Sequence, residues 1–123
     1  ARLAIGKRAK NEAIQYLQSQ GILVSKQASY AVKQDSKEEF WVNPQVNKLN
    51  GDWGIILNNN VTHELVVMHV PSFTFKLRTA SEDGLVVRSD KPHLIELKLN
   101  STTFKDNQSG LDFAPYITNR IKY

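Results

Sequence analysis

Apolar residues recur at helical spacing near the start of the chain. Between positions 7 and 20 there is no Gly or Pro, and Ala9, Ala13, Tyr16 and Leu17 form one apolar stripe. Gly21 follows directly, where the end of a helix favours a residue that tolerates positive φ. The pattern predicts a helix over residues 7–20 that packs one face on the rest of the protein.

The rest of the chain is mostly short apolar or alternating runs separated by turn residues. Two of these runs, 52–57 and 64–70, are joined by Asn58-Asn59-Asn60 and are expected to be central, adjacent antiparallel strands. At the C-terminus, Phe113, Tyr116, Ile117 and Ile121 recur at helical spacing, which predicts a helix over residues 111–122. The expected strand segments are 22–24, 30–33, 38–42, 52–57, 64–70, 73–78, 84–88 and 93–99.

These elements predict one α+β domain over residues 1–123. We expect the N-terminal helix to pack on a mainly antiparallel or mixed sheet of about seven strands, followed by the C-terminal helix. The first residues are Ala1-Arg2 rather than Met, as in a piece of a longer protein.

Composition excludes several classes of protein. An apolar share of 41% and a charged share of 23% are those of a globular chain. The absence of cysteine excludes disulfides, thiolate zinc sites and a cysteine nucleophile, and it fits a reducing, cytoplasmic location. No apolar run approaches the roughly 20 residues of a membrane span, so we expect no membrane association.

The net charge of +4 favours polyanionic partners. Basic residues gather near both ends of the chain, so Lys7, Arg8, Lys10 and Arg120 are candidate phosphate contacts if the two ends share a face. The alternative is an ordinary solvated surface, because lysine and arginine are normally exposed.

Aromatic residues provide a second indication of a binding surface. Phe40 and Trp41 are neighbours on an expected strand, so they must point to opposite faces and one of them is expected to be exposed. An exposed aromatic ring beside a basic residue such as Lys48 can stack on an unpaired nucleobase, as in proteins that bind single strands. Packing in the core explains most of the aromatic residues equally well.

The segment Ala13-Ile14-Gln15-Tyr16-Leu17, followed by Gly21-Ile22 and a set of strands, resembles the opening of restriction-endonuclease-like, or PD-(D/E)XK, nucleases. The resemblance covers about the first 25 residues and a strand pattern up to Val70. It implies a magnesium-dependent DNA endonuclease, a hydrolase whose site combines an Asp with Glu-x-Lys. Here Asp83 and, after twelve residues, Glu96-Leu97-Lys98 match that pattern, which implies Mg²⁺ ligation by Asp83 and Glu96 and a supporting Lys98.

Other interpretations of the same residues stay open. Glu96 and Lys98 on a half-exposed strand can be an ordinary solvated pair. Counted from the helix, the corresponding strand would instead be 65–71, where His69 and Pro71 replace the catalytic residues, and the fold would be a degenerate nuclease that binds without cutting. We expect a nucleic-acid-binding domain with DNA as its partner, and a protein-interaction module is the alternative.

Overall fold

A computed structural model describes residues 10–123, and it begins with helix α1, Lys10–Ser19. Ala13 and Leu17 of this helix are fully buried. The helix ends in a Schellman motif: Gly21 adopts φ 81° and donates to Gln18, and Ile22 donates to the carbonyl of Leu17 at 2.9 Å. The predicted helix and its glycine stop are therefore confirmed within the described residues, and positions 7–9 lie outside them.

Four strands form the first sheet: β1 (Ser29–Val32), β3 (Trp53–Asn59), β4 (Glu64–Val70) and β7 (Ile117–Lys122). Their order is β1-β3-β4-β7, and only the β1–β3 pair is parallel. The prediction that residues 52–57 and 64–70 form central antiparallel partners is confirmed, because β3 and β4 are paired in the middle of this sheet.

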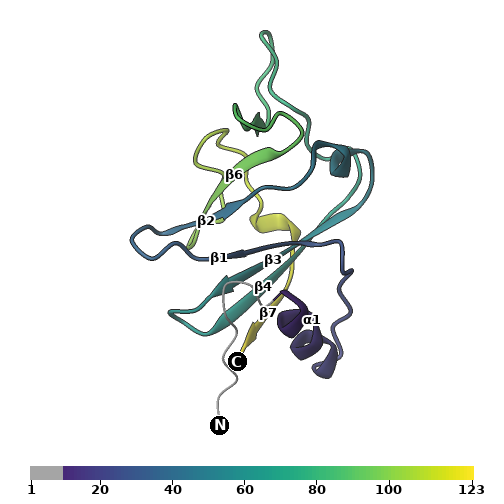
Figure 1. The fold of residues 1–123 in the computed structure, drawn as a ribbon, viewed down its shortest axis with the longest axis vertical. Helices are drawn as coiled ribbons and strands as arrows, with labels where there is room; N and C mark the ends of the chain where they lie inside the picture. The colour runs from purple at the N-terminus through teal and green to yellow at the C-terminus, as the bar shows by residue number, and fades with distance from the viewer. Residues whose placement is uncertain (1–9) are drawn as a thin grey trace.

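Three shorter strands form a second sheet in the order β2-β6-β5: β2 (Glu39–Val42), β6 (Ile95–Asn100) and β5 (Val86–Val87). The prediction of a single sheet is thus wrong, although seven strands are present in the described chain. Strands β1 and β2 are joined by a turn and pair only beside it, where Gln34 donates to the carbonyl of Glu39 at 3.0 Å and Lys33 forms a bridge to Phe40. Beyond this point the two strands separate into different sheets (Figure 1).

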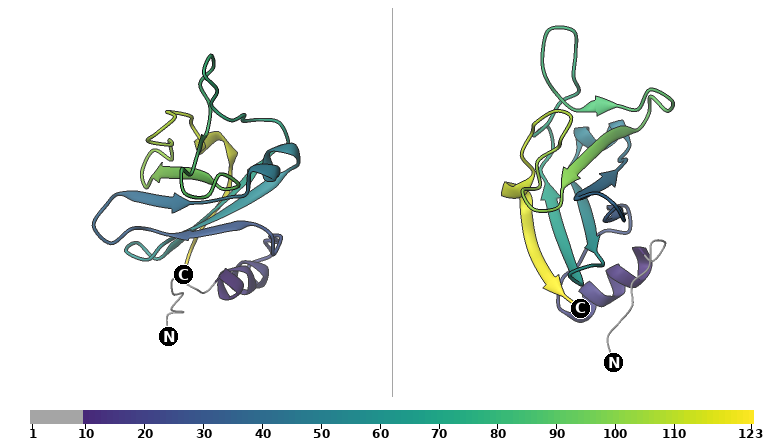
Figure 2. Two further views of the ribbon diagram at one scale, coloured as in Figure 1. Left: turned by 45° about the horizontal axis from the view of Figure 1, so that its top comes forward. Right: turned by 90° about the vertical axis from the view of Figure 1, so that its left-hand side faces the viewer.

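The molecule is layered as helix, four-stranded sheet and three-stranded sheet (Figure 2). Alternation along β3 separates the two cores, since Ile56 packs toward α1 while Ile55 and Leu57 pack in the core between the sheets. The core between the sheets also contains Phe40 and Phe113. No helix in residues 10–123 has both the length and the apolar character of a membrane span.

The predicted C-terminal helix is wrong. Residues 114–116 form a short 3-10 turn, η2 (Ala114–Tyr116), and the chain then continues as strand β7. The pairing of β7 with β4 runs from Glu64 opposite Lys122 to Met68 opposite Ile117. This pairing satisfies the backbone edge of β4, which a helix at the same place would leave without partners.

The strand predicted over residues 73–78 is also absent. The φ of 59° at Phe73 breaks the extended backbone at the first residue of the predicted strand. The side chain of Phe73 is 75% exposed. Phe75 instead stacks on Phe113 with ring centroids 4.5 Å apart. Leu77 makes a single bridge to Leu85, and the segment between them forms a loop that projects from the sheets at the top of Figure 1. The expected strand at residues 22–24 likewise forms no strand.

Candidate functional site

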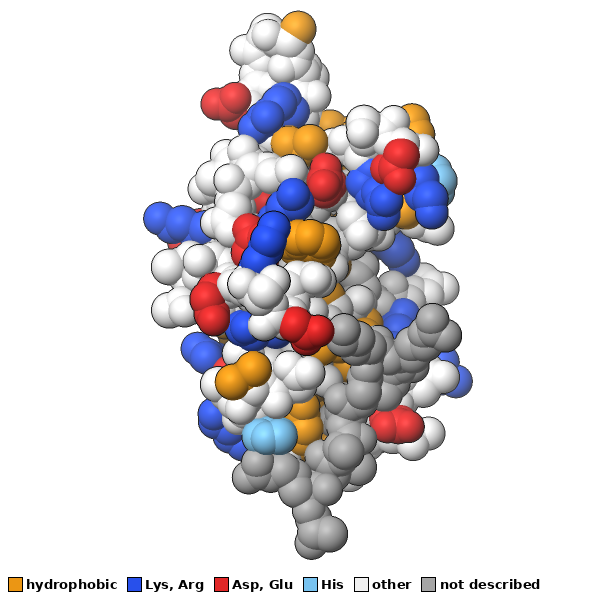
Figure 3. Space-filling model, turned by 60° about the vertical axis from the view of Figure 1, so that its left-hand side comes forward, with side chains coloured by type: hydrophobic (Ala, Val, Ile, Leu, Met, Phe, Trp, Pro, Cys, Tyr) orange, Lys and Arg blue, Asp and Glu red, His pale blue; other side chains and the backbone are white. Residues whose placement is uncertain are grey.

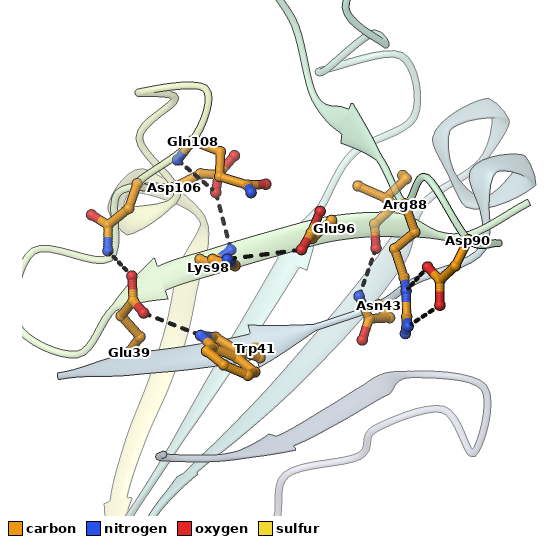
Figure 4. Close-up of polar contacts among 11 residues, drawn as sticks. Glu39, Trp41, Asn43, Arg88, Asp90, Glu96, Lys98, Asp106 and Gln108 are labelled. Atoms are coloured by element: carbon orange, nitrogen blue, oxygen red, sulfur yellow. Dashed lines mark hydrogen bonds and ion pairs between the residues drawn. The ribbon is translucent and has the colours of Figure 1, made fainter. Parts of the chain in front are cut away.

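Trp41 stands at the surface of the three-stranded sheet. Its neighbour Phe40 is 1% exposed in the core, whereas Trp41 is 40% exposed, so the prediction that one of the two faces outward is confirmed. The indole Nε1 donates to Glu39 at 3.1 Å, and Glu39 accepts a second hydrogen bond of 2.6 Å from Asn107 (Figure 4). These bonds hold the pKa of Glu39 below its ordinary value, and they fix the edge of the exposed ring.

Two lysines lie close to the face of this ring. The Nζ atom of Lys37 is 5.1 Å from the ring centroid of Trp41, and that of Lys98 is 5.3 Å away. Both distances are within the range of cation–π attraction. Lys98 reaches this position because it is the cross-strand partner of Trp41 on the outer face of the β2–β6 pair.

A groove of about 800 Å³ opens on one side of Trp41, and we call it the Lys10–Lys48 groove. Helix α1 supplies Lys10, the 3-10 helix η1 (Val46–Asn50) supplies Lys48, and β1 supplies Tyr30. None of the described residues that line it is acidic. Side-chain amides complete the wall: Gln27, Asn43, Gln45 and Asn47.

The two lysines of this groove are close enough to affect each other. Partial burial lowers the pKa of Lys10, and repulsion by the charge of Lys48 lowers it further. The Nζ atom of Lys48 donates to the carbonyl of Gln27 at 3.2 Å, which holds its charge beside β1. The groove is therefore a site of concentrated positive charge bordered by an exposed aromatic ring.

A second, smaller hollow of about 340 Å³ lies beside Trp41, and we call it the Trp41–Arg88 pocket. Its charges are balanced. Arg88 forms a bidentate pair with Asp90 at 2.7 and 3.0 Å, and Lys98 faces Glu96 at 3.8 Å (Figure 4). A space-filling view of this side of the molecule shows hydrophobic side chains surrounded by both basic and acidic ones (Figure 3).

The residues predicted to carry catalysis fall in two places. Glu96 and Lys98 share the outer face of β6 while Leu97 is buried, as strand alternation predicts. Asp83 is exposed in the projecting loop that precedes β5. Among residues 10–123 no group of three His, Cys, Asp or Glu side chains is placed to hold a metal ion, so Mg²⁺ ligation by Asp83 and Glu96 stays a prediction.

The residues predicted to contact nucleic acid also lie in different parts of the structure. Lys10, Trp41 and Lys48 line the same groove. Arg120 lies on β7, at the opposite edge of the four-stranded sheet from β1, and forms a bidentate pair with Glu64 at 2.8 and 3.2 Å. Lys7 and Arg8 lie outside the described residues.

Lys37 and Arg88 were not predicted as part of any site. Lys37 belongs to the turn before β2, so its closeness to Trp41 in the sequence was a usable signal. Arg88 carried no such signal, because it reaches the pocket through the pairing of β5 with β6.

Comparison of the chain with family models, with curated proteins and with solved structures finds no match in any of the three. The function is therefore inferred from the chemistry of these residues.

Proposed function

We propose that this domain binds nucleic acid, with DNA as the leading ligand, in the Lys10–Lys48 groove. The observation that carries the proposal is the meeting of Lys10, Lys48 and the exposed ring of Trp41, from three different elements, in one groove. Burial and repulsion from Lys48 both lower the pKa of Lys10, and phosphate groups of a polyanion would neutralise this repulsion. A backbone of phosphates provides such charges at regular spacing.

The exposed aromatic ring distinguishes nucleic acid from a simple anion. Base stacking on an aromatic ring contributes about 1–3 kcal/mol per base. Trp41 is suited to this role because its indole edge is held by Glu39 and its face remains partly open to solvent. Lysines along the groove would contact the backbone while one base stacks on Trp41.

The proposal includes two further expectations. The restriction-endonuclease-like resemblance predicts Mg²⁺-dependent hydrolysis of DNA by Asp83, Glu96 and Lys98. The absence of cysteine supports a cytoplasmic place of action.

Binding is tested with fluorescein-labelled DNA nonamers and duplexes, measured by fluorescence anisotropy at low salt. We expect Trp41→Ala to weaken binding of single strands about 5- to 150-fold, which corresponds to the loss of one stacking contact. Trp41→Phe should recover part of this loss. Phe73→Ala is the matched control, because Phe73 is an even more exposed aromatic and does not line the groove.

The outcomes separate the alternatives. If the wild-type protein binds neither single strands nor duplexes, the proposal is wrong and the protein-interaction module becomes the leading hypothesis. If Trp41→Ala and Phe73→Ala weaken binding equally, the groove is not the binding site. Adding Mg²⁺ or EDTA to the same samples tests hydrolysis: cleavage that needs both metal and Glu96 supports the endonuclease, and binding without cleavage supports the degenerate fold.

A further inference from the structure

The Trp41–Arg88 pocket has different chemistry from the Lys10–Lys48 groove, although both share Trp41 and Asn43. Its volume of about 340 Å³ is within the range of pockets that hold small ligands. Two cations and two carboxylates line it, so its net charge is balanced and a phosphate gains little there. A neutral, planar, polar group is better matched to it, and Trp41 provides a flat wall.

Glu96 and Lys98 place an acceptor beside a donor. The Glu96 carboxylate lies 3.8 Å from Lys98 Nζ, beyond hydrogen-bond distance, so this ion pair does not saturate the two groups. Arg88 is oriented by its two bonds to Asp90, which leaves Glu96 as the carboxylate whose hydrogen-bonding capacity is least committed in this pocket.

We propose that the Trp41–Arg88 pocket receives an unpaired nucleobase that presents an amino group beside an unprotonated ring nitrogen, as cytosine and adenine do. The inference rests on the proposed function and specifies its ligand. The Glu96 carboxylate accepts from the amino group, the Lys98 ammonium donates to the ring nitrogen, and the base packs against Trp41. In the same ring position thymine and uracil place a carbonyl oxygen against the Glu96 carboxylate and a ring N–H against the Lys98 ammonium, so both pairings are mismatched.

The base must be unpaired for this arrangement. In a duplex the ring nitrogen and the amino group of cytosine already bond to guanine, and the base faces are covered by stacking on their neighbours. A ring packed against Trp41, with its pairing edge turned to Glu96 and Lys98, therefore belongs to a single strand. The phosphates on one side of this base would lie toward the Lys10–Lys48 groove, since that groove adjoins the pocket at Trp41 and Asn43.

The test compares dC9 with dT9, two pyrimidine nonamers of equal length and charge, by anisotropy at a fixed salt concentration. We expect dC9 to bind about 5- to 150-fold more tightly than dT9, the discrimination of one good side-chain pairing with a base edge. In Glu96→Gln, whose amide can donate as well as accept, the difference in affinity between dC9 and dT9 should disappear. Glu82→Gln is the control, since it removes the same charge in the projecting loop, where Glu82 pairs with Lys76.

Each result is decisive for one of the two proposals. Equal binding of dC9 and dT9 by the wild-type protein overturns the base preference and leaves nucleic-acid binding intact. A preference for dC9 that survives in Glu96→Gln overturns the role of Glu96. Failure to bind either nonamer overturns the base-binding role of this pocket, and failure to bind duplexes as well overturns the proposed function itself. Thermal unfolding of each variant shows whether it is folded. The comparison of dC9 with dT9 on the wild-type protein does not depend on any variant.

Discussion

Replacing the two lysines of the Lys10–Lys48 groove provides the sharpest test of the electrostatic part of the proposal. Binding of a single strand loses affinity with salt at a logarithmic slope of about −0.7 for each phosphate that the protein neutralises. Raising salt from about 50 to 200 mM therefore costs roughly 2.6-fold in affinity per contact. If each lysine neutralises one phosphate, the double variant Lys10→Ala/Lys48→Ala should reduce the slope by about 1.4.

Each single variant should lose more than half of the binding free energy that the double variant loses. Lys48 lowers the pKa of Lys10 in the free protein, so removing either charge relieves a repulsion that costs free energy before any ligand is present. In a single variant the phosphate has no repulsion left to neutralise, so this favourable contribution is lost together with the contact of the replaced lysine. Coupling of this kind is expected for two charges that share one groove.

Anisotropy titrations of a single-stranded nonamer over several salt concentrations measure the slope. Lys122→Ala is the matched control, because Lys122 lies on β7, at the opposite edge of the four-stranded sheet from the groove, where its Nζ contacts the carbonyl of Thr62. An unchanged slope in the double variant would refute the reasoning. A reduction of about 0.7 in Lys122→Ala would also refute it, because each lysine would then count equally and binding would follow net charge rather than this groove.

Three further predictions concern the framework of the site. Leu17→Ala, at a fully buried position between helix and sheet, should lower the free energy of unfolding, measured by urea denaturation, by about 2–5 kcal/mol. Gln18→Ala, on the exposed side of the helix, should change the same free energy by less than about 0.5 kcal/mol. Gly84→Ala should cost about 1–3 kcal/mol in the same assay, because the added Cβ would stand 2.5 Å from the carbonyl oxygen of Lys76. The carboxyl of Glu39 should titrate by NMR below its ordinary 4.5, since an amide and an indole donate to its charged form. Its contribution to stability is then present above the ordinary pKa and is lost as pH falls through the lower, folded value, and an NMR pKa at or above 4.5 would contradict the bonding described.

The C-terminal strand shows where a sequence pattern is ambiguous. Ile117 and Ile121 are four residues apart, a spacing that places both side chains on one face of a helix and also on one face of a strand. The spacing alone therefore could not decide between the two. The decision depends on β4, whose free edge needs a partner from a segment about fifty residues later in the chain.

The segment that follows β4 shows the opposite error. Residues 73–78 alternate apolar and polar side chains as a strand does, but alternation forms a strand only where a partner strand is available. Phe75 instead inserts its ring against Phe113, and no ladder forms beyond the Leu77 bridge. Pairing between distant segments, rather than local pattern, decided both cases.

The candidate site was predictable as separate parts and not as an arrangement. The outward position of Trp41 followed from its neighbour Phe40, because that prediction needs only strand alternation. Lys10 and Lys48 were each candidates for phosphate contact, but their meeting depends on where α1 docks and on the turn that η1 makes before β3. No periodicity in the sequence encodes how close these two lysines come in the fold.

The layering of the fold explains why this groove, among the charged surfaces of the protein, combines lysines with an exposed ring. The chain crosses from one sheet to the other in the turn between β1 and β2, and Trp41 on the outward face of β2 lines a hollow together with residues 30–34. Helix α1 contributes Lys10 to the Lys10–Lys48 groove, which Trp41 also lines. Trp41 lies on β2 and Lys48 on η1, whereas Lys10 lies on α1. Detaching α1 from the sheet should therefore remove the phosphate contact of Lys10 and leave the stacking contact of Trp41 in place. Salt dependence and base stacking are thus separable properties of one groove.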